Sequence, residues 1–347
     1  MTDTTVPISL TPKPSDELLD VVGIGSPLVD VIARTSDDLL DRLQLTKGSM
    51  ELVDLDQAES IYASMGSSIE ISGGSAANTM AGIAGLGGLA GFIGKVADDT
   101  MGDVFTHDIT TIGVEFEAAV VPADGAGTGR CLVLVTDDAE RTMATHLGVA
   151  NTFAPGDVDG RLLERTKVTY LEGYLFDLDP AKEAMRQAVA TTHAADGSVA
   201  LTLSDRFCVE RHRRDFLDLL TGDLDLLFAN EDELTALFEA ASLERALDAL
   251  EETGVLGAVT RGSQGSVIVT PSGRLEIPAV PVDKVVDTNG AGDMFAAGFL
   301  FGMTNGLDPE RSASLASICA AEVISHLGAR PQTDLRILAK DAGLLEA

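Results

Sequence analysis

Along most of the chain, short apolar runs typical of strands alternate with amphipathic stretches that have the period of a helix. Residues 20–33 predict a buried strand, a turn of small residues and a second extended segment. From residue 167 onward, short apolar runs alternate with amphipathic stretches of helical period. The predicted strands are 167–176, 198–204, 224–230, 257–262 and 266–271, and the predicted helices are 180–195, 209–221, 231–239, 243–253 and those after 290. This alternation favours an α/β fold, a mostly parallel sheet with helices on both faces.

The first half of the chain adds a second kind of pattern. Residues 36–45 predict an amphipathic helix with Ser36 as its N-cap, and residues 90–97 predict one short strand. Residues 73–88 predict a glycine turn and a helix so rich in alanine and glycine that another element must pack closely against it. The segments between 115 and 148 are short, β-rich and separated by turns. We expect a single domain over 18–340, with a small β-sheet lid formed by about 28–55 and 113–148.

The composition indicates a protein of a reduced, aqueous compartment. Apolar residues make up 45% of the 347 residues, enough to bury a sizeable core. The polar, acidic N-terminal stretch predicts no signal peptide, and the longest apolar run, 294–303, is too short to span a bilayer. Cys131, Cys208 and Cys319 are too dispersed for a disulfide framework or a zinc motif. We therefore expect a cytoplasmic protein.

Acidic residues greatly outnumber basic ones. The 24 Lys and Arg residues and 55 Asp and Glu residues give a formal net charge of −31. Such a surface repels nucleic acids and anionic membranes, so we exclude both as partners. The even spread of the acidic residues favours a solvated surface, as in a salty cytoplasm, over a specific cationic partner. A phosphate site would need local compensation from amides, basic side chains or metal ions.

The stretch "DTNGAGD" places Asp287 and Asp293 at the two ends of a glycine-rich turn that opens an apolar helix. Unpaired amides at a helix N-terminus bind anions, and glycines let a ligand approach the backbone closely. A carboxylate beside such amides can act as a base. Asp293 would take a proton from a hydroxyl while the amides hold the charge of a transferring phosphoryl group. The plainer alternative is that Asp293 only stabilises the helix dipole.

Two more polar clusters follow predicted strands, where α/β sheets bind their ligands. Asn230 and Glu233 follow one strand, although an N-capped acidic helix start explains them as well. The turn 261–265 has amides that could face a phosphate, or it is an ordinary turn. The "GIG" at 23–25 lacks the third glycine of the dinucleotide fingerprint, because Leu28 stands there. No P-loop, HExxH or GxSxG motif occurs, which disfavours several other enzyme classes.

Four segments together resemble the ribokinase-like (PfkB) family of sugar and nucleoside kinases. They are "SGGSAANTMAGIAGLGG" (72–88), "NEDE" (230–233), "TRGSQG" (260–265) and "DTNGAGDMFAAGF" (287–299). The resemblance covers roughly residues 20–335 and its paired glycine motifs are highly specific. It implies a Rossmann-like three-layer α/β/α domain with a β-sheet lid. It also implies transfer of the γ-phosphoryl group of ATP to an alcohol, with Mg²⁺ and in many relatives K⁺.

The resemblance assigns a role to each matching residue. For catalysis it implies Asp293 as the base, with anion-hole amides from Gly290, Ala291 and Gly292. For the nucleotide it implies Asn230 and the Mg²⁺-organising Glu233, acting through water, and an ATP-lining turn made by Thr260, Gly262 and Gly265. For a monovalent cation, usually K⁺, it implies Asp287 and Asn289 with the segment near Gly328.

The acceptor is the harder question. Asp30, Gly74 and Asn78 match positions that bind sugar hydroxyls. The segments 25–31 and 137–151, the latter with Arg141 approaching the phosphates, are similar to those of the family's adenosine kinases, although Ser26 replaces their asparagine. Phe207 would stack on the base, or it fills the core at a strand end.

We therefore expect phosphorylation of the 5′-hydroxyl of a nucleoside, adenosine above all. Another nucleoside, or a free sugar such as ribose or fructose, is the alternative acceptor. A non-catalytic nucleotide or nucleoside sensor is the alternative from a different class. The lid sheet would have free edges that could pair with a second copy, so both a monomer and a homodimer are possible oligomeric states.

Overall fold

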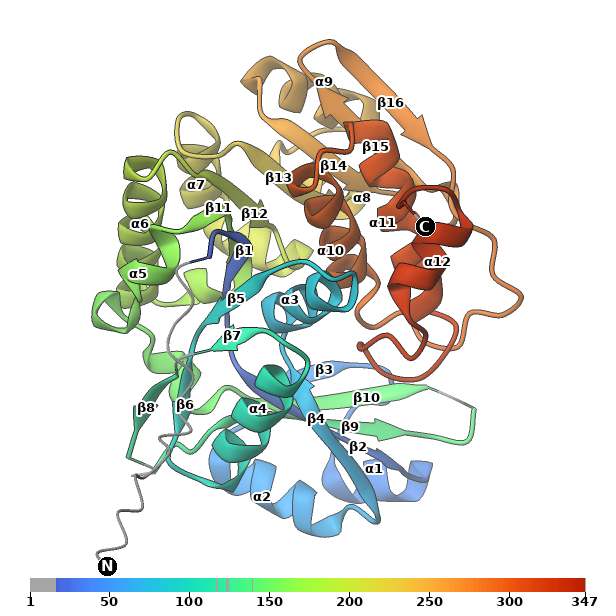
Figure 1. The fold of residues 1–347 in the computed structure, drawn as a ribbon. Coiled ribbons are helices and arrows are strands. Elements are labelled where there is room, and N and C mark those ends of the chain that lie inside the picture. The colour runs from blue at the N-terminus through green and yellow to red at the C-terminus, as the bar shows by residue number, and fades with distance from the viewer. Residues whose placement is uncertain (1–16, 117, 123–124, 139, 347) are drawn as a thin grey trace, which may run out of the picture.

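The computed structural model describes residues 17–346 apart from 117, 123–124 and 139. The described residues form a large sheet of nine strands, a smaller sheet of five and a pair of short strands (Figure 1). Across the large sheet the order is β16 (Gly273–Ile277), β15 (Ser266–Thr270), β14 (Leu256–Thr260), β13 (Leu226–Asn230), β12 (Ser198–Thr202), β11 (Thr166–Glu172), β1 (Leu19–Ile24), β5 (Ala90–Ile93) and β7 (Glu115–Phe116). Only the pairs β14–β15 and β15–β16 are antiparallel. The expected mostly parallel α/β sheet is confirmed.

Helices cover both faces of the large sheet, because successive strand residues point to opposite faces. In β1, Val22 and Ile24 belong to one core and Val21 belongs to the other. The first core packs against α5 (Gly160–Leu163), α6 (Asp179–Ala194), α7 (Arg206–Leu220), α8 (Glu231–Leu237) and α9 (Leu243–Thr253). The second packs against α3 (Ser75–Gly85), α10 (Ala291–Thr304), α11 (Pro309–Val323) and α12 (Leu335–Asp341). The three-layer arrangement is thus as expected.

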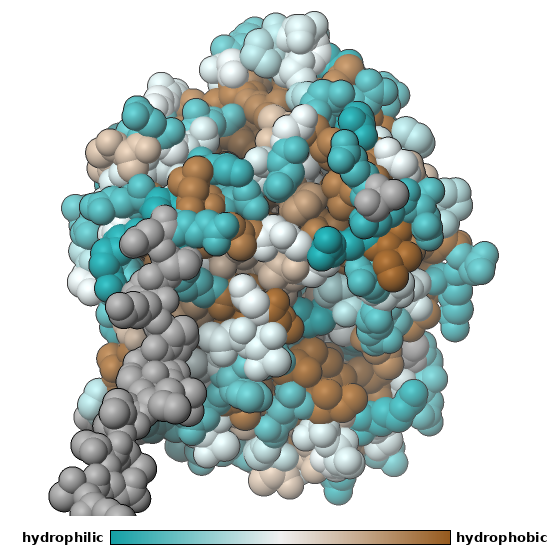
Figure 2. All heavy atoms as spheres, viewed as in Figure 1, coloured by the Kyte–Doolittle hydropathy of each residue, from teal (hydrophilic) through white to brown (hydrophobic). Residues whose placement is uncertain are grey.

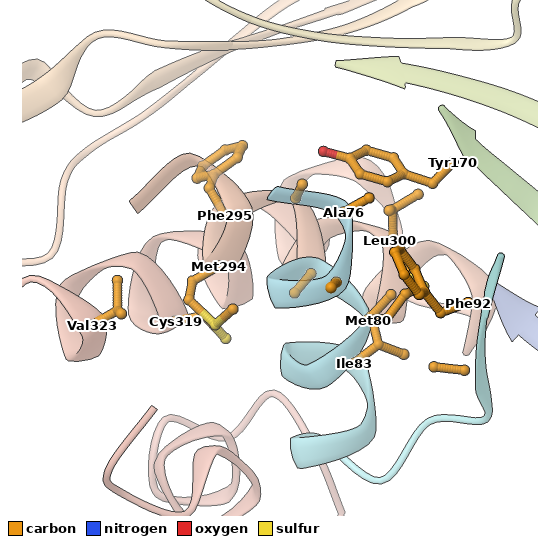
Figure 3. Close-up of a cluster of buried hydrophobic side chains, with 14 of the residues drawn as sticks. Ala76, Met80, Ile83, Phe92, Tyr170, Met294, Phe295, Leu300, Cys319 and Val323 are labelled. Atoms are coloured by element: carbon orange, nitrogen blue, oxygen red, sulfur yellow. The ribbon is translucent and has the colours of Figure 1, made fainter. Parts of the chain in front are cut away.

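The glycine- and alanine-rich helix α3 packs closely against α10, as its composition predicts. A Cβ atom on Gly82 of α3 would lie 2.6 Å from the Cβ atom of Ala297 in α10. Figure 3 shows the two helices side by side, with Met80 and Ile83 on one and Met294 and Leu300 on the other. The close packing brings the N-terminal turns of α3 and α10 next to each other.

The smaller sheet lies at one end of the large sheet (Figure 1). Its order is β3 (Met50–Leu52), β10 (Arg141–His146), β9 (Gly129–Val135), β2 (Leu28–Arg34) and β4 (Ser68–Gly73). One face, with Val31 and Leu132, packs into the core with α1 (Asp37–Leu43), α2 (Leu55–Ser64) and α4 (Thr100–Thr111). The opposite face carries Asp30 and Cys131, which are paired across β2 and β9.

The strands of the smaller sheet differ in part from the expected ranges 28–55 and 113–148. β4, residues Ser68–Gly73, lies outside both ranges and forms an edge of the sheet. β7 joins the large sheet instead, because Phe116 packs with Phe92 and Phe105 in an aromatic cluster. β8 (Ala119–Val121) pairs with β6 (Lys95–Ala97).

Two local expectations also need correction. The segment 90–97 is two strands, β5 and β6, that separate at Gly94, where a Cβ atom would lie 2.6 Å from Pro27. Ser36 occupies the N-cap position of α1, but its side chain makes no capping hydrogen bond.

No helix among the described residues is long and apolar enough to cross a membrane. On the face in Figure 2, hydrophilic and hydrophobic residues are interspersed. The three cysteines are free and buried.

Candidate active site

The turn before α10 requires glycine at one position. Gly290 has a φ of 79°, and a Cβ atom there would lie 2.8 Å from both Cα and Cβ of Ala329. The adjacent Gly292 has open space around it. The turn is therefore pressed against the 328–330 segment on one side and open on the other.

Not every amide of the predicted anion hole is free. The Ala291 N–H donates to the Thr288 carbonyl oxygen at 3.2 Å. Within the described part of the chain, the N–H groups of Gly290, Gly292 and Asp293 have no protein acceptor. The unpaired donors at the start of α10 are thus those three, and the contribution predicted for Ala291 is already used in the turn.

Asp293, in the first turn of α10, receives hydrogen bonds from the start of α3. Ser75 Oγ donates to Oδ1 at 2.7 Å, and Asn78 Nδ2 donates to Oδ2 at 3.0 Å. Burial raises the pKa of Asp293, while these two hydrogen bonds and the positive charge of Arg330 act in the opposite direction. A fixed carboxylate with a raised pKa is what a general base requires.

Asp30 lies close by on β2. Its carboxylate packs directly against Gly73, where a Cβ atom would come within 2.4 Å of the Asp30 carboxyl carbon. Burial raises the pKa of Asp30 to about 7; the charges of Arg330 and Arg141 oppose the rise and the charge of Asp293 adds to it. The negative charge of Asp293 therefore disfavours ionisation of Asp30.

Gly74 and Asn78, the other two predicted acceptor-binding residues, lie at the start of α3. Gly74 has a φ of 95°, and a Cβ atom there would lie 2.2 Å from the Ser26 carbonyl oxygen. Asn78 is buried, and its Oδ1 atom has no hydrogen-bond partner among the described residues. A buried acceptor without a donor is costly, so this atom is suited to a ligand hydroxyl.

Arg141 connects the smaller sheet to the glycine-rich turn. Its Nη2 atom lies 2.5 Å from Oδ2 of Asp287, and both side chains are largely buried. The same Oδ2 accepts from the Gly328 N–H at 2.9 Å, and Oδ1 accepts from the Asn289 N–H at 3.0 Å. The Arg141 guanidinium nitrogens lack hydrogen bonds of good geometry within the described residues. Arg141 thus offers buried donors at this end of the site.

Asn230 and Glu233 form a capping box at the start of α8. Asn230 Oδ1 accepts from the Glu233 N–H at 2.9 Å, and Glu233 Oε2 accepts from the Asn230 N–H at 3.0 Å. Burial raises the pKa of Glu233 to about 7. The capping alternative is therefore present in the structure. Whether Glu233 also orients Mg²⁺ stays a prediction.

The turn predicted to line ATP lies beside this capping box, because Thr260 of β14 pairs with Asn230 of β13. Gly262 has a φ of 54° and open space around it. Gly265 has a φ of 84°, and a Cβ atom would lie 2.0 Å from the Ile277 carbonyl oxygen. Gly265 is thus required by the packing of β16, whereas Gly262 leaves the backbone accessible.

Phe207 does not fill the core. It lies in the first turn of α7 and is 70% exposed, so the interpretation of Phe207 as a core residue is wrong. Its stacking on a base stays a prediction.

Three residues that bear on the site were not singled out from the sequence. Ser75 lies inside a motif that was recognised, and Glu172 follows an apolar strand, a position typical of ligand-binding residues. Glu172 is buried and its Oε2 accepts from the Ala76 N–H at 2.9 Å; burial raises its pKa to about 7. Nothing local indicates the third, Arg330. Among the described residues, no group of three His, Cys, Asp or Glu side chains could hold a metal.

Residues 49–335 of the chain match the pfkB family of carbohydrate kinases. The chain belongs to this family. Kinases of this family use ATP, usually with Mg²⁺, and phosphorylate small molecules.

Relatives of this PfkB kinase differ in their acceptors. Adenosine kinase of Saccharomyces cerevisiae is 30% identical, over 89% of this chain and 95% of the yeast protein. ATP-dependent ribose-1-phosphate kinase of Halopiger xanaduensis is 34% identical, over 77% of this chain and 85% of that protein. The crystal structure of adenosine kinase from Sinorhizobium meliloti matches with a TM-score of 0.86 and 45% identity, over 93% of this chain and 99% of that one.

Proposed function

We propose that this kinase transfers the γ-phosphoryl group of ATP to the 5′-hydroxyl of adenosine, giving AMP and ADP. The observation that carries the proposal is the arrangement around Asp293. Asn78 donates to Asp293 through Nδ2 and keeps Oδ1 buried without a partner, with the carboxylate of Asp30 close by. A ribose fits this set, because its hydroxyls can donate to both Asp30 and Asn78.

The proposed reaction uses these residues as follows. The 5′-oxygen of the acceptor attacks the γ-phosphorus of ATP, the bond to the β-phosphate oxygen breaks, and Asp293 takes the hydroxyl proton. The unpaired amides of Gly290 and Gly292 and the donors of Arg141 would hold the charge on the transferring group. The smaller sheet would exclude water, which competes as an acceptor.

A row of side chains beside Asp30, apolar except for a threonine hydroxyl that donates to Cys131, favours a base-bearing acceptor over a free sugar. Asp30 is paired with Cys131, Cys131 with Thr145, and Thr145 with Leu52, so the four side chains share one face of the smaller sheet. Leu52, at the far end, is 62% exposed. With a ribose on Asp30, this row would lie along an attached base, and burial of apolar surface would stabilise the complex. Phe207 is our candidate for stacking on the other side of the base.

Both predicted ion sites involve a carboxylate that already has partners within the chain. Glu233, buried near the ATP turn, accepts from Asn230 through both of its oxygens and would orient the waters of Mg²⁺, an ion that neutralises phosphate charge. Both oxygens of Asp287 also have partners, so K⁺ near Asp287 and Asn289 would share that carboxylate with Arg141. We further propose that the enzyme works in the cytoplasm, as a monomer or a homodimer.

A sugar or sugar phosphate is the second candidate acceptor. It is favoured by the 34% identity to a ribose-1-phosphate kinase and by Nε and Nη1 of Arg141, two buried donors without a hydrogen-bond partner among the described residues, which could hold a second phosphate. The apolar row from Cys131 to Leu52 offers such an acceptor no cation, which is why we place adenosine first.

The deciding experiment measures ADP release with ATP and Mg²⁺ across adenosine, inosine, guanosine, cytidine, ribose, fructose and ribose 1-phosphate. We expect a kcat/KM for adenosine well above the others. Preference for ribose 1-phosphate or a free sugar would overturn the acceptor but keep Asp293 as base. An absence of turnover with every acceptor would favour a non-catalytic sensor.

A further inference from the structure

We propose that Arg330 is a positioning residue that holds the two halves of the active site together and supplies positive charge to its carboxylates. This inference rests on the proposed phosphoryl transfer and adds a residue to it. The halves are the 72–78 corner, which leads from β4 into α3, and the 287–293 turn, which leads into α10.

Among the described residues, the hydrogen bonds of the Arg330 guanidinium all go to the 72–78 corner. Nε and Nη2 donate to the Ser72 carbonyl oxygen at 3.1 and 2.9 Å, and Nη2 also donates to Ser72 Oγ at 2.8 Å. Nη1 donates to the Ala77 carbonyl oxygen at 3.1 Å. Asp108 of α4 completes the network by accepting from Ser72 Oγ at 2.5 Å and from its N–H at 2.8 Å. One side chain therefore clamps the last residues of β4 to the first turn of α3.

The backbone just before Arg330 is fixed to the other half. The Gly328 N–H donates to Asp287, and Ala329 packs against Gly290 at a distance that only glycine allows. Three consecutive residues, 328–330, thus contact both the turn that carries the base and the corner that holds it. Farther along the chain, Glu322 Oε1 accepts from the Gln332 and Thr333 N–H groups at 2.9 and 2.7 Å. These bonds fix the residues that follow Arg330 to the end of α11.

What Arg330 holds is the part of the corner that contacts the reacting groups. Gly73 packs on the Asp30 carboxylate, and Ser75 and Asn78 donate to Asp293. The carboxylates that face Arg330 are Asp30, Asp293 and Asp108. Without the guanidinium, the corner would lose four hydrogen bonds and two active-site carboxylates would lose a neighbouring cation. Since a misplacement of about 1 Å can cost about 10²-fold in rate, the effect should be kinetic.

The test compares Arg330→Met, Arg330→Lys and the control Arg336→Met. Arg330 lines a cleft of about 450 Å³, so Met can be accommodated, and Arg336 is an exposed arginine on the nearby α12. We expect Arg330→Met to lower kcat by about 10²-fold with little change in the KM for ATP, and to shift the acid limb of the pH–rate profile upward. Arg330→Lys should restore the acid limb but only part of kcat. Hydrogen exchange of the amides of 75–78 should accelerate in Arg330→Met alone.

The outcomes separate this inference from the proposed function. If the wild type prefers another acceptor, the same comparison is made with that acceptor. If the wild type shows no turnover, the proposed function fails and hydrogen exchange decides: faster exchange at 75–78 in Arg330→Met supports the clamp. Wild-type exchange in Arg330→Met overturns it, and so does a kcat equal to that of Arg336→Met.

Discussion

Asp293 becomes a candidate base through its neighbours. An aspartate in the first turn of a helix is ordinarily a favourable dipole partner and nothing more. Here it is half-buried, its two oxygens receive hydrogen bonds from Ser75 and Asn78, and its pKa is raised by burial. Beside it lie unpaired amides and the Asp30 carboxylate. In the proposed reaction, this arrangement would hold the carboxylate where both a hydroxyl and a phosphoryl group can reach it.

Replacing the base should stop chemistry and spare binding. For Asp293→Asn we expect kcat to fall by about 10²–10⁴-fold, the usual worth of general-base catalysis. The KM for ATP and the melting temperature should change little, because the amide can still accept from Ser75 and Asn78 can turn its own amide over to accept from the new NH₂ group. Steady-state kinetics with a thermal melt measure this, and Asp283→Asn, an exposed aspartate of the same loop, is the control. Wild-type turnover in Asp293→Asn would remove Asp293 from the mechanism.

The helix α3 contributes Ser75 and Asn78 to the site, and its N-terminus is stabilised by a residue of a strand. Gly74, its N-cap residue, has no side chain to cap the helix, and the carboxylate of Glu172 at the end of β11 accepts from the Ala76 N–H instead. Gly25 allows this approach, because a Cβ atom there would lie 2.3 Å from Glu172 Oε2. The cap costs the burial of a charge, which is why the pKa of Glu172 is raised to about 7.

The buried charge of Glu172 predicts a pH-dependent stability. Because its pKa is higher in the folded than in the unfolded chain, folding takes up a proton between about pH 4.5 and 7, and stability falls as pH rises through that window. Glu172→Gln keeps an acceptor for Ala76 and removes the charge. Its free energy of unfolding should exceed that of the wild type by up to about 3 kcal/mol at pH 8, and the two should converge near pH 4.

Denaturant unfolding at several pH values measures the difference. Glu252→Gln, which changes an exposed glutamate, should follow the wild type throughout. A difference for Glu172→Gln that does not vary with pH would contradict the buried-charge account.

The smaller sheet should set the acceptor preference through its apolar row. Leu52→Ala is expected to raise the KM for adenosine by about 10-fold, since burying a leucine side chain is worth about 1.5–3 kcal/mol. The KM for ATP should not change, because the row belongs to the smaller sheet and the 260–265 turn joins two strands of the large one. Ile69→Ala is the matched control, an equally exposed residue at the edge of the same sheet. Equal effects of the two substitutions in the acceptor assay would refute the role of the row.

At the scale of the whole molecule, charge repulsion opposes folding. With a formal net charge of −31, the compact state repels itself, while its surface ion pairs contribute little each. Salt reduces this repulsion, because the Debye length falls to about 3 Å at 1 M. We expect the melting temperature to rise by several degrees between 0.1 and 2 M salt, with activity retained.

Comparing KCl with NaCl separates screening from a specific cation site. Screening alone should raise the melting temperature equally in both salts, whereas occupancy of a site near Asp287 should raise kcat in KCl only. Unfolding or precipitation at 2 M salt would rule out the high-salt interpretation of the acidic surface.

Local sequence patterns determined the periods of the elements, their buried faces and the glycine-rich turns. These features follow from residues close together in the chain, since strand alternation, helical period and the positive φ angles of Gly74 and Gly290 are properties of the local backbone. The motifs around Asn78, Asn230 and Asp293 are also short local patterns that can be recognised in the sequence. The sequence therefore sufficed for the α/β fold, and the family match confirms the kinase class.

Only the tertiary structure decided which charged side chains pair with each other and which polar side chains hold another segment in place. The pairing of Arg141 with Asp287, the cap that Glu172 supplies to α3 and the clamp of Arg330 on Ser72 join segments that lie far apart in the chain. The same is true of β4 and β7, whose sheet partners were not evident from their residues. Such contacts depend on how the layers pack, because an ion pair or a strand edge takes the partner that packing brings within reach, and no local period encodes that choice.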